Sequence, residues 1–532
     1  MIPPSLSSLL IGALATVASA AVVEYDWDIT WVTAAPDGFT RPVIGVNDVW
    51  PCPEIRAVQG DTIRLKINNK LGNQTTSIHF HGINQIGSNW MDGPSLVTQC
   101  PVIPGVSFTY EFVADTAGTF WWHSHEMGQY PDGLRGPLII EDPNDPHAGE
   151  YHEQSHILGE AFLNPNNPDG IPPAAQSIIL NDGQGADYAF AAGKNYRFRI
   201  INIAAAPSAM IHFDSHNMTV IMSDVDHVEE EEVSQLRISP GQRYDVIVKG
   251  AEDDDRNFGI LVALDENRDY SQPGAVWGRN ATGNLIIDPE QETSPVIVEE
   301  WRAANDSLFK PVNDKAILPA ADKTMLFNFN ECTDSDEIVR HCVNSSYYVG
   351  PKVPTLYTAA TTGGNNTKEA VYGAIHPFIV SSGDIIDIVV NNHDPGVHPF
   401  HLHGYHFQVL TRPGSNAGDW PGSELASPNY NQEPPRRDTV DVYAMSHAVL
   451  RFQASNPGVY LFHCHMDWHV EMGLTATIIE SPELLTDITI PEDHLEACRN
   501  GGYPIAGNAA GNVEDPLDTT GIEYEPPVEY TG

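Results

Sequence analysis

Short apolar runs with a strand-like pattern recur along the chain. TIRLKI (62–67) and YRFRII (196–201) alternate apolar and polar side chains, and IIDIVV (385–390) is rich in β-branched residues. Gly, Pro, Asn and Asp flank these runs. Short strands between turn residues are typical of β-sandwiches. The pattern therefore predicts an all-β protein.

The same stretch of sequence occurs three times. GDTIRLKINNK from Gly60 is followed by HFHG, GDIIDIVVNNH from Gly383 by HLHG, and GKNYRFRIINI from Gly193 by IHFD. GTFWWHSH after the first copy also matches GVYLFHCH after the last. In the middle copy, Asp214 stands in the place of the second histidine. A period this long exceeds that of solenoid repeats and indicates one domain used three times.

These repeats and the ends of the chain predict five segments. The first twenty residues hold an apolar run and end in Ala-Ser-Ala, a pattern typical of a secretory signal peptide. Later in the chain we find no apolar stretch of about 18 residues, so we expect no membrane anchor. The expected segments are a signal peptide (1–20), domain 1 (21–145), domain 2 (146–295), domain 3 (296–490) and an acidic C-terminal extension (491–532).

The chain is strongly acidic. Its 27 Lys and Arg residues against 71 Asp and Glu give a formal net charge of −44. A phosphate backbone requires a basic face, so we exclude nucleic acid as a partner. Six N-x-S/T sequons fit a secreted glycoprotein; they begin at Asn73, Asn217, Asn280, Asn305, Asn344 and Asn365.

Four histidine pairs with i, i+2 spacing lie in strand-like sequence. Side chains alternate along a strand, so each pair projects both imidazoles to one side. Eight imidazoles from two copies of one domain predict a polynuclear transition-metal centre. An isolated pair would more often be an ordinary surface or core feature. The pairs are His79/His81, His123/His125, His401/His403 and His463/His465.

Cys464 lies inside the fourth pair, and the same alternation turns its sulfur toward a second site. His398 and His469 are available there, and one Cys with two His is the ligand set of a blue-copper site. Leu474, ten residues after the cysteine, stands at the axial position and cannot coordinate; Met472 is the rival axial residue.

The motifs HFHG, WHSH, HPFHLHG and HCHMDWH, with DGLRGPLII after the second, resemble the copper signatures of the multicopper oxidases. Within that family the chain resembles the fungal laccases and the fungal iron-uptake ferroxidases. The resemblance implies three cupredoxin-like Greek-key β-sandwich domains and four copper ions. The implied ligands are His398, Cys464 and His469 for type 1 copper, His79 and His401 for type 2, and His81, His123, His465, His125, His403 and His463 for the type 3 pair.

The resemblance also implies roles for acids and cysteines. Asp92 and Asp467 match acids that relay protons to the copper cluster, although each could instead cap a turn or hydrogen-bond the scaffold. Cys100 and Cys498 match a family disulfide. Two further cysteines, Cys332 and Cys342, are ten residues apart and are expected to pair locally, which leaves Cys52 as a buried free thiol.

The resemblance gives two interpretations of the substrate. Asp214 matches a laccase acid that accepts the phenolic proton, and Asp394 matches a ferroxidase position. Arg340 replaces a ferroxidase tyrosine, and no third iron-site acid can be placed between about 260 and 340. PKVPTLYTA and DHLEACRNGG nevertheless resemble ferroxidases.

We expect a secreted, monomeric enzyme that couples four one-electron oxidations to the reduction of O2 to two waters. Laccase-type oxidation of phenols is the preferred interpretation, and oxidation of Fe(II) is the alternative. An iron permease is a partner only under the alternative. Two competing hypotheses are copper storage without turnover, which would need no cysteine relay, and a nitrite reductase, which would need no complete set of eight cluster histidines.

Overall fold

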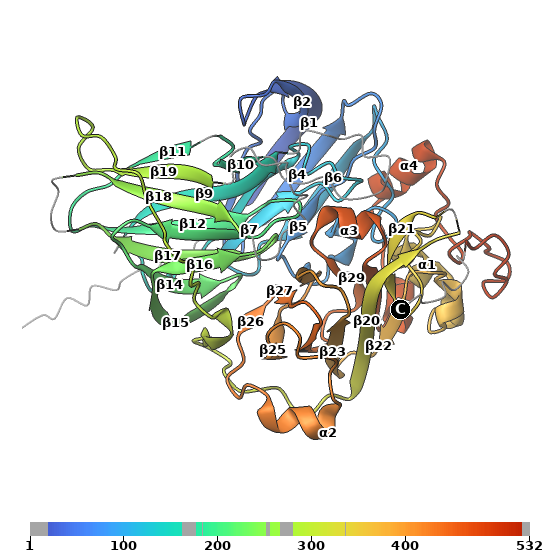
Figure 1. Cartoon of the computed structure of the whole chain (residues 1–532). Helices are drawn as coiled ribbons and strands as arrows, with labels where there is room; N and C mark the ends of the chain where they lie inside the picture. The colour runs from blue at the N-terminus through green and yellow to red at the C-terminus, as the bar shows by residue number, and fades with distance from the viewer. Residues whose placement is uncertain are drawn as a thin grey trace, which may run out of the picture.

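The computed structural model describes residues 20–149, 151–161, 177–183, 185–251, 256–265, 280–335 and 337–523. Residues 1–19 of the expected signal peptide lie outside this range. The described residues form six β-sheets, which follow one another in sequence as three pairs, and the all-β prediction is confirmed. We call the pairs the first, second and third sandwich; Figure 1 shows them in blue, green and yellow to red, gathered around a common centre.

The first sandwich has two four-stranded sheets. One has the order β2 (Arg41–Val46), β1 (Val22–Ala34), β4 (Thr62–Asn69) and β6 (Ser107–Val113). The other has the order β3 (Ile55–Val58), β8 (Arg135–Glu141), β7 (Gly118–His123) and β5 (His79–His81).

The second sandwich has a six-stranded and a five-stranded sheet. The larger has the order β10 (Ser177–Leu180), β9 (His152–Ala161), β12 (Asn195–Asn202), β17 (Arg243–Lys249), β14 (Met218–Ser223) and β15 (Asp226–Val233). The smaller has the order β11 (Gly185–Ala189), β19 (Asn280–Ile286), β18 (Phe258–Leu264), β13 (Ala209–Phe213) and β16 (Gln235–Ile238).

The third sandwich repeats this arrangement. Its larger sheet has the order β21 (Val339–Val343), β20 (Lys323–Thr333), β23 (Ile385–Asn392), β28 (Ser446–Gln453), β25 (Phe407–Thr411) and β26 (Arg436–Arg437). The smaller has the order β22 (Pro377–Val380), β30 (Thr475–Glu480), β29 (Gly458–Cys464), β24 (His398–Leu402) and β27 (Thr439–Val442).

Helices are short and lie mostly in the connections of the third sandwich. The α-helices are α1 (Thr355–Thr361), α2 (Ser423–Ala426), α3 (Asp467–Glu471) and α4 (Glu492–Gly501). The 3₁₀ turns are η1 (Asn89–Met91), η3 (Asp306–Leu308), η4 (Gly363–Asn365), η5 (Glu369–Val371), η6 (Ser427–Asn429) and η7 (Pro482–Asp487). No described helix is long and apolar enough to cross a membrane.

Strand alternation explains the sandwich interiors. In β4, Ile63, Leu65 and Ile67 are fully buried, and the residues between them face outward. β12 has the same alternation in sequence, but its Arg197 and Arg199 are each only 3% exposed. The polar face of this sheet packs against the first sandwich, where Arg199 donates to Thr119 of β7. Both arginines also pair with buried Asp245 of β17, in their own sheet. Alternation of apolar and polar residues therefore shows which side chains share a face of the strand. Where two domains are in contact, the polar face is buried as well.

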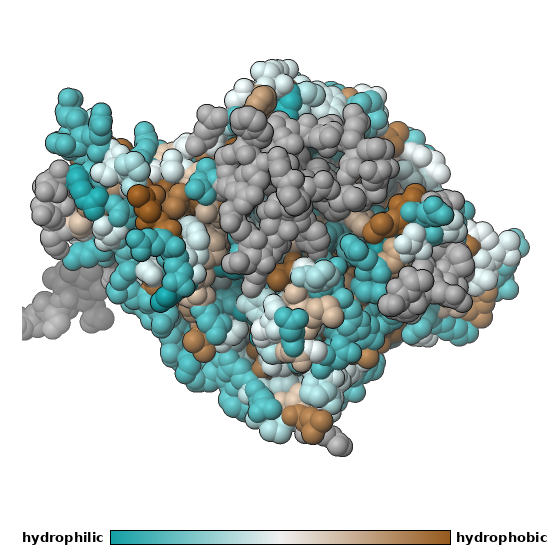
Figure 2. Space-filling model, in the orientation of Figure 1, coloured by the Kyte–Doolittle hydropathy of each residue, from teal (hydrophilic) through white to brown (hydrophobic). Residues whose placement is uncertain are grey.

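Two disulfides join segments as expected. Cys100 pairs with Cys498, which ties the first sandwich to α4 through a shared apolar cluster, and Cys332 pairs with Cys342 between β20 and β21. Cys52 is buried and unpaired. Figure 2 shows hydrophilic residues over most of the coloured surface of one face, as the charge of −44 suggests.

Glu480, the last residue of β30, gives the third sandwich a pH-dependent stability. Its side chain is fully buried, accepts a hydrogen bond from Tyr405 and has a second oxygen without a partner among the described residues. Burial raises its pKa from 4.5 to about 7. The folded state therefore binds this proton more tightly than the unfolded chain, so stability should fall as the pH rises from 4.5 to 7.

We expect Glu480→Gln to stabilise the protein at pH 8 by up to about 3 kcal/mol and to have little effect near pH 4.5, because the glutamine cannot ionise. Thermal unfolding of both proteins across this pH range measures the effect. Glu483→Gln changes an exposed acid nearby and serves as the control. An equal shift at both ends of the range would show that burial of the charge is not the cause.

Candidate metal centre

The four histidine pairs meet between the first and third sandwiches. β5 pairs with β7 so that His79 lies opposite His123, and β24 pairs with β29 so that His401 lies opposite His463. The strand pairs thus bring their histidines to one place. In each of three groups the potential ligand atoms lie within 4.8 Å of one another: His79, His81 and His401; His81, His123 and His465; and His125, His403 and His463.

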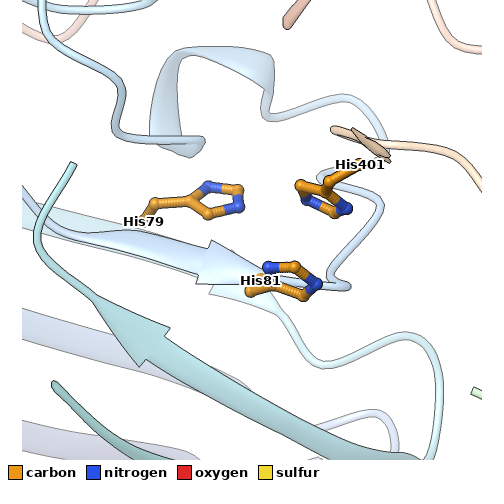
Figure 3. A group of neighbouring side chains, drawn as sticks. All are labelled: His79, His81 and His401. Carbon is orange, nitrogen blue, oxygen red and sulfur yellow. The ribbon is translucent and has the colours of Figure 1, made fainter. Parts of the chain in front are cut away.

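Figure 3 shows the first of these groups. His79 and His81 project from β5, and His401 projects toward them from the third sandwich. The rings of His81 and His401 stack with centroids 3.7 Å apart. One site is therefore built from residues more than 300 positions apart in the sequence.

The imidazoles fit bound metal. Among the described residues, His79 Nε2, His123 Nε2, His401 Nε2 and His465 Nδ1 are buried without a hydrogen-bond partner. Burial, reinforced by neighbouring side-chain charges, lowers the pKa well below the usual range for His81, His123, His125, His401, His403 and His465. Neutral imidazole is the form that binds metal, so the site is ready for a cation that supplies the missing partners.

A second site surrounds Cys464. Its Sγ lies 3.5 Å from His469 Nδ1 and 3.7 Å from His398 Nδ1, and the two nitrogens are 3.1 Å apart. Three ligands held at the 2.0–2.3 Å bond lengths common for first-row metals would be separated by about 3.5–4 Å. All three residues are buried, and the Cys464 amide donates a hydrogen bond to the backbone carbonyl of Leu474, which is also buried. The triangle matches the ligand set of a blue-copper site.

The two sites are connected by the chain itself. His463 and His465 flank Cys464, and they belong to two different histidine groups of the first site. The alternation along β29 directs the cysteine sulfur one way and the imidazoles the other. An electron that arrives at the cysteine therefore has a covalent route to both groups.

Asp92 orients two histidines of the cluster. Its Oδ2 lies 2.8 Å from His403 Nδ1, and its backbone carbonyl lies 2.7 Å from His79 Nδ1. A hydrogen bond on one ring nitrogen directs the other nitrogen of each ring toward a metal. Asp92 Oδ1 is buried and lies 3.3 Å from His79 Nδ1, but it has no hydrogen-bond partner among the described residues.

Asp467 lines a small cavity beside the same cluster. The cavity has a volume of about 30 Å³, enough for a water molecule, and its walls include His125, His463 and His465. Burial raises the Asp467 pKa well above the usual range, and the charge of Glu471 raises it further. Burial therefore favours the protonated form of this carboxyl next to the cluster.

Three polar side chains lie beside the Cys464 site. Asp394 Oδ1 is 3.0 Å from His398 Nε2; burial raises the Asp394 pKa, but the contact with this histidine brings it down to about 2. Glu331 interacts electrostatically with both residues. The His341 ring is buried with its centroid 4.3 Å from that of His469. Glu331 and His341 are missing from the sequence-based set.

The strand register explains these two additions. β20 runs parallel to β23, and the last pair is Phe329 opposite Asn392, so Glu331 and Asp394 each lie two residues beyond it. β21 returns beside β20 with His341 opposite Glu331. Their spacing in the sequence carries no such signal.

Asp214 is not brought into these groups. It follows β13 in the second sandwich, and its Oδ2 accepts a hydrogen bond from Arg256 at 2.8 Å. The contact between the second sandwich and the Cys464 region lies at the opposite end of this strand, where Arg237 bonds both Ser208 and Asp441. A substrate role for Asp214 remains a prediction.

Comparisons with known proteins decide the family. Three family models, each described as multicopper oxidase, match residues 28–145, 149–276 and 348–484. The chain belongs to the multicopper oxidase family. The three sandwiches are accordingly its three cupredoxin domains, and the family and the histidine groups together support four copper ions per chain.

Several relatives of this multicopper oxidase are named for iron transport. The "Iron transport multicopper oxidase fetC" of Epichloe festucae is 40% identical, over 97% of this chain and 86% of that protein. The crystal structure of Fet3p, a "Multicopper Oxidase that Functions in Iron Import", matches with a TM-score of 0.89 and 33% identity, over 95% of this chain and all of that one. A laccase from Botrytis aclada matches with a TM-score of 0.80 and 26% identity, over 91% and 92%.

Proposed function

We propose that this multicopper oxidase is a secreted ferroxidase. Four Fe(II) ions each give one electron, and one O2 with four protons becomes two waters. The observation that carries the proposal is the pair of carboxylates, Asp394 and Glu331, beside the histidine of the Cys464 site. Carboxylate oxygens are hard ligands that suit iron and favour the Fe(III) product. The names of the relatives support the same substrate and favour it over the laccase preference.

The proposed copper ligands are those that the sequence indicates. When bound, copper supplies the one-electron acceptor and the site of O2 reduction. We propose that type 1 copper would be held by His398, Cys464 and His469, beside Leu474, which cannot coordinate a metal. The proposed type 2 ligands are His79 and His401, and the proposed type 3 ligands are His81, His123 and His465 with His125, His403 and His463. We further propose domain boundaries near 145, 295 and 490.

The carboxylates have separate roles at the iron end. Asp394 accepts a hydrogen bond from His398, so an iron ion on its other oxygen would be one hydrogen bond from a type 1 ligand. Glu331 is exposed and meets incoming Fe(II) first. The protein would act as a monomer outside the cell and deliver Fe(III) to an iron permease.

Steady-state kinetics with two substrates test the proposal. Losing one charged ligand costs about 1.5–3 kcal/mol, or about 10–100-fold in kcat/KM for Fe(II). We expect that loss for Glu331→Gln and for Asp394→Asn, with kcat/KM for 2,6-dimethoxyphenol changed less than about threefold, because a phenol needs no metal ligand.

Glu337→Gln is the matched control, since it removes another exposed acid from the β20–β21 hairpin. Equal losses for both substrates would show that the acids support the type 1 site and not iron. A wild type that prefers the phenol would restore the laccase interpretation.

A further inference from the structure

The second sandwich, which supplies none of the proposed copper ligands, reaches the cluster with one segment. This segment, Ser239–Arg243, has the sequence SPGQR and leads into β17. A Cβ added at Gly241 would lie 2.9 Å from both His81 Cε1 and His465 Cδ2. The segment therefore passes directly against two cluster imidazoles, and a glycine is required at the point of contact.

Arg243 ends this segment and joins all three sandwiches. It is fully buried. Its Nη1 and Nη2 donate to Asp438 Oδ1 and Oδ2 at 2.7 and 2.6 Å, in the third sandwich. Its Nε donates to the Thr119 carbonyl of the first sandwich at 3.0 Å. Bidentate pairing fixes the orientation of a carboxylate as well as its position.

Asp438 and its neighbour in turn contact two cluster histidines. Asp438 Oδ1 lies 3.1 Å from His81 Nε2, and the Asp438 carbonyl lies 2.9 Å from His401 Nδ1. Thr439 Oγ1 lies 3.2 Å from each of the same two nitrogens. Both nitrogens are thereby placed to carry the ring proton.

The opposite nitrogens are left for metal. His81 Nδ1 faces His465 Nε2 at 3.1 Å, and His401 Nε2 is buried without a partner among the described residues. Because Asp438 holds the protonated nitrogens, its orientation decides which nitrogen each ring offers. His81 would thus bind through Nδ1 and His401 through Nε2.

The glycine of the HFHG motif makes room for this contact. Gly82 has φ +92°, and a Cβ there would lie 2.8 Å from Arg243 Nη2 and 3.1 Å from Asp438 Oδ2. The motif therefore requires glycine next to His81 both for its backbone conformation and for the approach of the guanidinium.

We propose that Arg243 of the second sandwich is a positioning residue for the type 2 and type 3 copper ligands, acting through Asp438 to fix the ring orientation of His81 and His401. The inference rests on the copper ligands proposed above, but not on Fe(II) as the substrate. It gives the middle domain a specific task, which is to lock histidines from the first and third domains into one site.

Arg243→Lys keeps the charge and loses the bidentate geometry. In this variant we expect type 2 copper occupancy to fall at least twofold, measured by electron paramagnetic resonance and copper content, and the remaining type 2 signal to change its hyperfine splitting. The type 1 signal and blue absorbance should stay unchanged, because Arg243 does not contact that site. Arg199→Lys is the control, since Arg199 bonds Thr119 and Asp245 at the same domain contact.

A second variant, Arg243→Met with Asp438→Asn, removes both charges together and decides the question if the lysine variant does not fold. It should show the same selective change. An unaltered type 2 signal in a folded variant, or equal loss of type 1 and type 2 copper, would overturn the positioning role. A wild type without any type 2 signal would instead refute the ligand assignment itself.

Discussion

Replacing Cys464 by serine is expected to abolish both the blue absorbance and turnover. In the proposed type 1 site the thiolate is the strongest ligand, and Cys464 is covalently connected to His463 and His465. A serine hydroxyl replaces neither. Copper content should fall from four ions to three per chain, because the histidine groups of the cluster keep all their imidazoles. We expect kcat to fall at least about 10³-fold, which corresponds to about 4 kcal/mol in the activation barrier.

The chain contains its own control for this change. Cys52 is the other unpaired cysteine among the described residues, and it is also buried. Its sulfur contacts backbone carbonyls of Ile44 and Gly133 in the first sandwich. Cys52→Ser should therefore keep four copper ions, the absorbance and the activity. A blue Cys464→Ser protein, or a colourless Cys52→Ser protein, would contradict the assignment.

The histidine pairs could be predicted because their geometry is local. The i, i+2 spacing puts two rings on one side of a strand wherever the strand lies in the fold. The repeat shows that strands from two copies of the domain occupy equivalent positions. The cysteine inside the last pair follows from the same rule. For these residues the path from sequence to site requires no knowledge of how the domains pack.

Glu331, His341 and Arg243 could not be predicted in this way. The first two reach the Cys464 site through the pairing of β20 with β23 and with β21, and strand partners are not visible in the spacing of residues. Arg243 reaches the cluster through the contact of three domains. In a strand pattern it is simply the first polar residue of β17.

Asp214 illustrates the opposite case. The repeat places it where a second histidine stands in the other two copies, and this equivalence suggests a functional acid. In the second sandwich, however, Asp214 follows β13, which is not among the strands that carry the histidine groups. Its carboxylate pairs with Arg256. Equivalent residues of duplicated domains occupy the same place within the domain fold. Their distance from a site between domains depends on how the domains pack together.

Asp467→Asn is expected to slow the reduction of O2 while electron entry continues. Four protons are consumed per O2, and burial raises the pKa of Asp467, which lines a cavity beside His463 and His465 with room for one water. Asparagine preserves the shape but cannot release a proton. Loss of a positioned general acid costs about 10²–10⁴-fold. Stopped-flow reoxidation of the fully reduced enzyme should therefore slow by at least about 10²-fold, while reduction of the type 1 site by substrate keeps its rate.

Two further variants distinguish proton delivery by Asp467 from a purely structural role of this residue. Asp92→Asn should also slow reoxidation, but it replaces the charged acceptor for His403 by a weaker neutral one and should disturb the cluster spectrum as well. Asp115→Asn is the control, because burial raises the pKa of this carboxyl too, and its side-chain hydrogen-bond partner is the adjacent Thr116 in the first sandwich. If Asp467→Asn bleaches the protein or lowers its copper content, Asp467 supports the scaffold. A slow reoxidation in a fully loaded blue protein leaves proton delivery as its role.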